Sequence, residues 1–192
     1  MLIPTSIIIA CWAAMILFWT VSAFNVKHDI KNSPWRRFGW LRIVLILVIL
    51  SVLWARSSLG TLTHRLGILQ AVSPNSSLAF IGALLCILGI SYAIWARVHL
   101  GRNWSPIPNV KEGHELITSG PYRLVRHPIY TGIIVAALGT GLVIPVWLVI
   151  FIVMTAVFIW RVHVEEELMT KQFPSQYPEY KKRTWALLPF IW

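Results

Sequence analysis

The stretch Ile129–Trp160, IYTGIIVAALGTGLVIPVWLVIFIVMTAVFIW, decides the fold that this sequence predicts. It runs for 32 residues without a charged side chain. One helix of that length would measure about 48 Å, whereas the hydrocarbon core of a bilayer is only ~30 Å thick. Pro145 lies in its middle, where it removes a backbone donor and clashes with the preceding turn. We therefore expect two helices, Ile129–Ile144 and Val146–Trp160, joined by a tight bend.

Three further apolar stretches precede this pair, at Ile3–Phe24, Phe38–Trp54 and Leu78–Val98. The 192 residues are 57% hydrophobic and 12% charged, with a mean hydropathy of +0.68. A soluble domain has about 25% charged residues, so this composition excludes both a soluble fold and a disordered chain. We expect an all-α integral membrane protein with five transmembrane helices, the last two forming a hairpin over a cytoplasmic cofactor pocket. Because both hairpin helices are short, a re-entrant hairpin is the alternative.

Basic residues flank the apolar stretches unevenly. Residues 25–39 hold four, residues 97–128 hold five and the segment from Arg161 onward holds five. The remaining loop, residues 55–77, holds only two. The positive-inside rule then places the N-terminus outside and the C-terminus in the cytoplasm. The net charge of +10 is interpreted as a topology signal and as contact with membrane lipid, not as a nucleic-acid interface.

The acidic residues gather in the second half of the chain, where Glu112, Glu115, Glu165, Glu166, Glu167 and Glu179 all lie. This predicts a three-helix membrane scaffold at 1–99 and a functional region at 100–192, within one compact domain. Cys11 and Cys86 both lie inside apolar runs, which excludes a disulfide scaffold and a cysteine-based zinc site. We expect no metal, and neither a nucleophile elbow nor a phosphate loop is present.

Two polar clusters border the last pair of helices. His127-Pro128 predicts a helix start, with Pro128 at the first helical position. If the last apolar helix continues beyond the membrane surface, Arg161 and Glu165 share one of its faces. The hairpin would bring Arg161 back beside His127, and such a site suits a zwitterionic cofactor together with a charged headgroup. Gly139-Thr140-Gly141 is interpreted as a flexible element before the bend.

Four motifs stand in order along the C-terminal half: Gly120-Pro121-Tyr122, Arg126-His127-Pro128-Ile129-Tyr130, Glu165-Glu166-Glu167-Leu168 and Gln176-Tyr177-Pro178-Glu179-Tyr180-Lys181-Lys182. In this combination the chain resembles the isoprenylcysteine carboxyl methyltransferase family. That family belongs to a wider group of integral-membrane methyltransferases that includes the phospholipid N-methyltransferases. The resemblance runs from about Leu100 to the C-terminus.

The resemblance implies that S-adenosylmethionine binds on the cytoplasmic side and that the acceptor arrives from the bilayer. The residues that it assigns to the cofactor are His114, Glu115, Leu116, Ile117, Tyr122, His127, Pro128, Ile129, Tyr130, Glu165 and Glu166. It assigns Arg161 to the carboxylate of the acceptor, and Arg161, Glu165 and His127 to catalysis. Gly139-Thr140-Gly141 has the form of the Gly-x-Gly by which the phospholipid branch describes its cofactor site.

The acceptor that this resemblance favours is a prenylated thiol carboxylate or a small analogue. A carboxylate is ionised at neutral pH and needs no general base. Methylation of a phospholipid amine is the first alternative, and it would require a base such as Glu165 or His127. A reductase of the sterol type with a nicotinamide cofactor and a membrane scaffold without activity are further alternatives. The sequence leaves the oligomeric state open.

Overall fold

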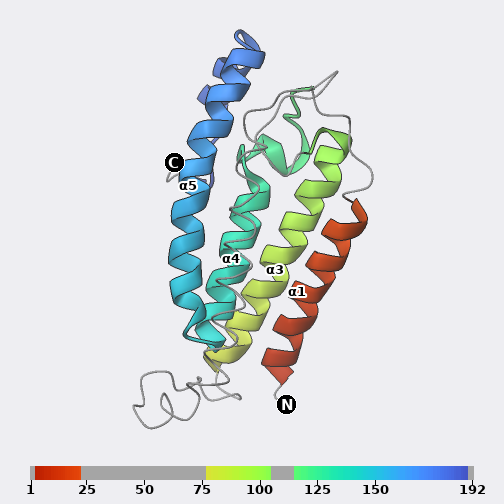
Figure 1. The fold of residues 1–192 in the computed structure, drawn as a ribbon, viewed down its shortest axis with the longest axis vertical. Helices are drawn as coiled ribbons and strands as arrows, with labels where there is room; N and C mark the ends of the chain where they lie inside the picture. The colour runs from red at the N-terminus through yellow and green to blue at the C-terminus, as the bar shows by residue number, and fades with distance from the viewer. Residues whose placement is uncertain (1–2, 23–76, 105–114, 190–192) are drawn as a thin grey trace.

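The described part of the chain is built from helices that lie side by side (Figure 1). The computed structural model describes residues 3–22, 77–104 and 115–189. Its α-helices are α1 (Ile3–Ser22), α3 (Ser77–Leu100), α4 (Pro128–Val143), α5 (Trp147–Gln172) and α6 (Gln176–Arg183). Two short 3₁₀ turns, η2 (Gly101–Asn103) and η3 (Gly120–Arg123), lie between α3 and α4. The predicted span Phe38–Trp54 lies outside the described residues.

Three of these helices are long and apolar enough to cross a membrane: Ile3–Ser22, Ser77–Asn103 and Trp147–Gln172. The first and third apolar stretches of the sequence are therefore helical, as predicted. The fourth helix, α4, is also apolar but shorter, at 16 residues. Exposed aliphatic side chains such as Ile16, Leu84 and Ile152 cover the outside of the bundle, which is the pattern of a surface that faces lipid.

The long apolar block is broken at Pro145, as predicted. α4 ends at Val143 and α5 begins at Trp147. The turn between them is closed by bonds from the Trp147 amide to the Ile144 carbonyl at 2.9 Å and from the Leu148 amide to the Pro145 carbonyl at 2.9 Å. Pro145 thus lies at a position in the turn where its carbonyl accepts a hydrogen bond and no backbone N–H donor is required.

Two sequence-based expectations about this pair were wrong. Gly139-Thr140-Gly141 is not a flexible element, because α4 continues as a regular helix through it. The last helix does not end at Trp160 but runs on to Gln172. Glu165 and Glu166 therefore lie inside α5, with more than a turn of helix after them.

Glycines set the close approach of α3 and α4. A Cβ atom added at Gly82 would lie 2.5 Å from the Gly139 carbonyl oxygen, and one added at Gly89 would lie 2.5 Å from that of Gly132. The two contacts run in opposite directions along the helices, so α3 and α4 are antiparallel. Lipid offers no hydrophobic drive between helices, so small residues that allow the backbones to meet supply the packing. This contact places the end of α3 beside the start of α4.

The tail beyond α6 packs back against the segment that leads into α4. The Arg126 amide donates to the Trp185 carbonyl at 2.8 Å, and the His127 amide donates to the Ala186 carbonyl at 3.0 Å. These bonds form a short parallel bridge between the two segments. The entry to α4 is thereby held from one side by the tail and from the other by α5.

The glycine contact leads to a stability prediction. Gly89→Leu forces a side chain into the backbone of α4, and we expect it to destabilise the protein by about 2 kcal/mol or more. Ser91→Leu is the matched control, because it adds the same bulk at an exposed position two residues further along α3. Thermal unfolding in detergent micelles measures both. Equal midpoints for the two variants would contradict the assigned contact.

Candidate functional site

A cavity opens between the end of α3, the segment that leads into α4, and α5. Its volume is about 870 Å³, including the part that is open to solvent. Of the residues that the sequence assigned to a site, the cavity wall contains Glu115, Leu116, Ile117, Tyr122, His127, Ile129, Tyr130 and Glu165. The structure thus gathers most of the predicted residues around one space.

The other predicted residues lie elsewhere. Arg161 and Glu166 are not part of the cavity wall but contact residues that are, and Pro128 is the buried first residue of α4. His114 lies outside the described residues. Gly139, from the Gly-x-Gly, packs against Gly82 and does not border the cavity.

Sequence reasoning missed half of the cavity wall: Leu100, Asn103, Trp104, Arg126, Leu168, Met169, Tyr177 and Tyr180. A signal existed for some of them. Leu168 and Met169 follow Glu165 by three and four positions, so one helix face carries all three. Asn103 and Trp104 gave no such signal, because their place depends on how the end of α3 meets the rest of the chain.

Three side chains converge on the carboxylate of Glu165, which belongs to α5. The Tyr130 hydroxyl donates to its Oε1 at 2.5 Å, and Arg161 Nε donates to the same oxygen at 2.7 Å. His127 Nδ1 lies 3.4 Å from Oε2. The tyrosine and histidine belong to the start of α4, some 35 positions earlier in the chain. The predicted proximity of Arg161, His127 and Glu165 is therefore present.

Glu166 ties the tail to the same place. Arg126 Nε bonds its Oε1 at 2.6 Å, and Lys181 Nζ bonds its Oε2 at 2.6 Å. Arg126 also donates to the carbonyl of Thr184. The two neighbouring carboxylates of α5 thus have different roles. The carboxylate of Glu165 faces the cavity, whereas that of Glu166 holds the segment before α4 and the tail together.

We call the six charged or titratable groups the ion cluster: Arg126, His127, Arg161, Glu165, Glu166 and Lys181. Two carboxylates face three permanent cations and one imidazole, so the ion cluster carries a net positive charge. It is shielded from solvent in large part, which strengthens each interaction relative to water. A surplus of positive charge beside a half-enclosed cavity suits a ligand with a carboxylate or another anionic group.

Aromatic rings hold His127 in place. The imidazole stacks on the Tyr130 ring at 5.6 Å with an angle of 2°, and Tyr130 stacks on Phe158 of α5 at 4.5 Å. Burial works against a charge on the imidazole, but the carboxylates of Glu165 and Glu166 outweigh it and raise the pKa of His127. His127 is thereby a better cation than an ordinary histidine at neutral pH.

Two buried polar atoms in the cavity wall find no hydrogen-bond partner among the residues that the structure describes: Asn103 Oδ1 and His127 Nε2. The nearest carboxylate oxygen of Glu166 is 3.6 Å from His127 Nε2, beyond hydrogen-bond distance. Buried polar atoms are rarely left unpaired, so these two indicate that the cavity holds a polar ligand. The described residues contain no group of three or more His, Cys, Asp or Glu that could hold a metal.

A charge-removal experiment tests the ion cluster. Glu166→Gln leaves Arg126 and Lys181 without their anion, and we expect the protein to lose roughly 3 kcal/mol of stability. Glu167→Gln is the matched control, because the Glu167 side chain is 68% exposed and pairs with the equally exposed Lys171. Thermal unfolding in detergent compares them. A Glu167→Gln midpoint as low as that of Glu166→Gln would contradict the assignment.

The raised pKa of His127 predicts how stability depends on pH. A group whose pKa is higher in the folded state adds its full stabilisation below about pH 6.5, the ordinary pKa of histidine. That stabilisation is lost as the pH rises through the folded-state pKa. We therefore expect the unfolding midpoint of the unaltered protein to fall as the pH rises above about 6.5. His127→Gln should flatten that part of the curve. A slope unaffected by the substitution would mean that other groups are responsible; those that face His127 are Glu165, Glu166, Arg126 and Tyr130.

Comparison with known proteins connects this site to a family. The sequence profile described as phospholipid methyltransferase matches residues 78–176. A probable protein-S-isoprenylcysteine O-methyltransferase of Oryza sativa subsp. indica is 33% identical over 118 residues, which cover 59% of this chain and 62% of the rice protein. The protein-S-isoprenylcysteine O-methyltransferase of Saccharomyces cerevisiae is 38% identical over 116 residues, 58% of this chain and 48% of the yeast protein.

A solved structure has a similar fold. It is that of the eukaryotic intramembrane Ras methyltransferase ICMT, with a TM-score of 0.58 and 24% identity, covering 84% of this chain and 55% of that one. This chain thus spans about half to three fifths of the length of these relatives. The profile covers more than half of the chain and includes nearly all of α3 and the whole of α4 and α5. The resemblance seen in the motifs is therefore confirmed, and the chain is an integral membrane protein that belongs to the phospholipid methyltransferase family, with isoprenylcysteine O-methyltransferases among its relatives.

Proposed function

We propose that this chain is a methyltransferase that uses S-adenosylmethionine to methylate the carboxylate of a prenylcysteine-like lipophilic acceptor. The observation that carries the proposal is the cavity beside the ion cluster, where Tyr130, His127 and Arg161 converge on Glu165 at one end of α4 and α5. Relatives that carry the name isoprenylcysteine O-methyltransferase support the choice of acceptor.

The cavity fits the cofactor in chemistry. Its wall combines apolar side chains with the two unpartnered polar atoms of Asn103 and His127, which a polar ligand would satisfy. The residues that would hold the cofactor are those members of the set predicted from the motifs that line the cavity: Glu115, Leu116, Ile117, Tyr122, His127, Ile129, Tyr130 and Glu165. The proposal also keeps His114, Pro128 and Glu166 from that set. When bound, S-adenosylmethionine supplies an electrophilic methyl group on a positively charged sulfur. The Glu165 carboxylate is suited to lie near such a cation.

Arg161 would orient the acceptor. Its guanidinium lies 5.6 Å from the centre of the Tyr130 ring and bonds Glu165, so it stands at the border of the cavity rather than in its wall. A charge-assisted hydrogen bond there would hold an acceptor carboxylate in one position for attack. An acceptor carboxylate is already ionised, so none of these residues needs to remove a proton.

Methylation of a phospholipid amine is the second candidate, favoured by the family whose profile matches the chain. An amine must lose a proton before it attacks, and this would give Glu165 or His127 the role of a base. The fully paired carboxylate of Glu165, with two donors on one oxygen, makes it a weak base. We therefore rank the carboxylate acceptor first.

The same proposal includes the arrangement in the membrane. We propose five spans with α4 and α5 as a hairpin, the N-terminus outside, and the cavity and C-terminus in the cytoplasm. The division of the chain into a scaffold at 1–99 and a catalytic region at 100–192 of one domain is part of it. The charge bias of the loops supports the orientation. S-Adenosylmethionine is a water-soluble cofactor, which agrees with a cavity that opens beyond the apolar part of the helices.

A transfer assay tests the proposed activity. Purified protein is given S-adenosylmethionine with a labelled methyl group and, separately, a prenylcysteine, a phosphatidylethanolamine vesicle and a small thiol. We expect label in a base-labile ester on the prenylcysteine. Arg161→Lys retains the charge but loses the planar fork, and should lower kcat/KM for the acceptor about 100-fold while binding of S-adenosylhomocysteine stays within about twofold.

Lys171→Ala is the matched control, since it removes an exposed cation from the same helix as Arg161. Its transfer rate should equal that of the unaltered protein. Label on the vesicle lipid instead of the prenylcysteine would select the second candidate. A loss of cofactor binding in Arg161→Lys would overturn the role of Arg161.

A further inference from the structure

Asn103 lines the cavity from the turn that ends α3, and no role for it follows from the motifs. It belongs to η2, is only 7% exposed, and forms part of the cavity wall. Its Oδ1 is buried without a hydrogen-bond partner in the described part of the chain. A buried amide oxygen without a partner is a strong acceptor for a hydrogen-bond donor on a ligand.

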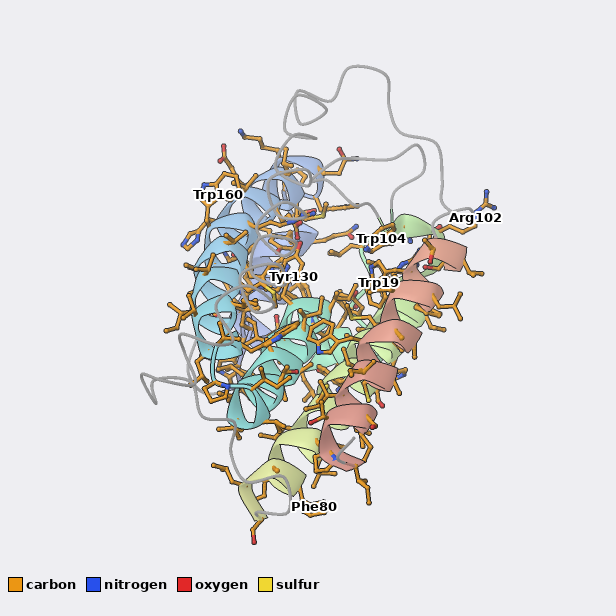
Figure 2. All side chains as sticks on the ribbon, turned by 60° about the horizontal axis from the view of Figure 1, so that its bottom comes forward. Trp19, Phe80, Arg102, Trp104, Tyr130 and Trp160 are labelled. Atoms are coloured by element: carbon orange, nitrogen blue, oxygen red, sulfur yellow. The ribbon has the colours of Figure 1, made fainter. Side chains whose placement is uncertain are left out.

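The neighbourhood of Asn103 is apolar and aromatic. Leu100 and Trp104, its neighbours along the chain, line the same cavity. The Arg97 guanidinium lies 4.4 Å from the centre of the Trp104 ring and donates to the Gly101 carbonyl at 2.8 Å, which fixes both the ring and the turn. Trp104 lies on the side of the bundle nearer α1, whereas Tyr130 lies on the side nearer α5 (Figure 2). The cavity thus has a charged side at the ion cluster and an apolar side at η2.

We infer that Asn103 accepts a hydrogen bond from the exocyclic amino group of the cofactor's adenine, an inference that rests on the proposed function. The cofactor has three kinds of donor. Its ammonium group is charged and is better matched by a carboxylate, and its ribose hydroxyls are well solvated. The adenine amine is a neutral donor on a flat apolar ring, and an aromatic wall with one buried acceptor matches it. Asn103 is then a residue that determines specificity for an aminopurine.

The experiment compares S-adenosylhomocysteine with its analogue that lacks the amino group, the purine riboside form, by titration calorimetry in detergent. The unaltered protein should bind the amino form about tenfold more tightly, because the analogue leaves Oδ1 buried and unpaired. Asn103→Leu should bind the two compounds within about twofold of each other. Asn103→Asp presents only acceptor oxygens and should keep the preference.

Arg102→Leu is the control, since it changes the exposed neighbour of Asn103 and should leave the ratio unaltered. Equal binding of both compounds by the unaltered protein overturns the inference about Asn103, as does a tenfold preference that survives in Asn103→Leu. If Asn103→Leu does not fold, the unaltered protein and Asn103→Asp still decide. Failure of the unaltered protein to bind either compound overturns the proposed function itself, a result distinct from a lost preference.

Discussion

Burial of two adjacent carboxylates is the constraint on which the site depends. Glu165 and Glu166 follow a helix that is apolar for four turns, and an unpaired carboxylate there would be costly. Their cations come from the segment before α4, from α5 itself and from α6, so both carboxylates are fully paired only when all of these elements are in place. The ion cluster therefore acts as the junction of the fold as well as a wall of the site.

The glycine contact between α3 and α4 supports that junction from the other side. Gly82 and Gly89 allow the two backbones to meet, which brings the end of α3 to the start of α4. The Tyr122 side chain bonds the Ala96 carbonyl at 3.4 Å, and Tyr180 bonds the Tyr122 carbonyl at 2.6 Å. The cavity lies where these contacts leave space, with rigid helices on its sides.

The site combines groups that favour opposite charges. The Glu165 carboxylate favours a cation, whereas Arg126, Arg161 and the imidazole of His127 favour an anion. A transfer from a sulfonium to a carboxylate consumes one charge of each sign, and exclusion of water favours such a reaction. The proposed roles of these residues thus follow from one electrostatic arrangement and need no proton transfer.

Much of the fold could be predicted from the amino-acid sequence, because the length of an apolar stretch and the effect of a proline on a helix are local properties of the chain. The break at Pro145, the helix start at Pro128 and the i, i+4 relation of Arg161 to Glu165 all depend on neighbours within a turn or two. The expectation that Arg161 returns beside His127 followed from one bend and a count of residues, whereas the place of Tyr130 came from the resemblance. The prediction for Gly139 was wrong because its role is a contact with α3, which local flexibility does not reveal.

Only the tertiary structure decided the partners of Glu166 and the place of Asn103. Lys181 and Arg126 reach Glu166 because the tail folds back along the segment before α4, a pairing between backbone groups that no side-chain pattern encodes. Asn103 enters the cavity because glycine packing sets where α3 ends relative to α4. Local preferences determined the helices and their order along the chain, and contacts between distant segments determined which side chains share the cavity.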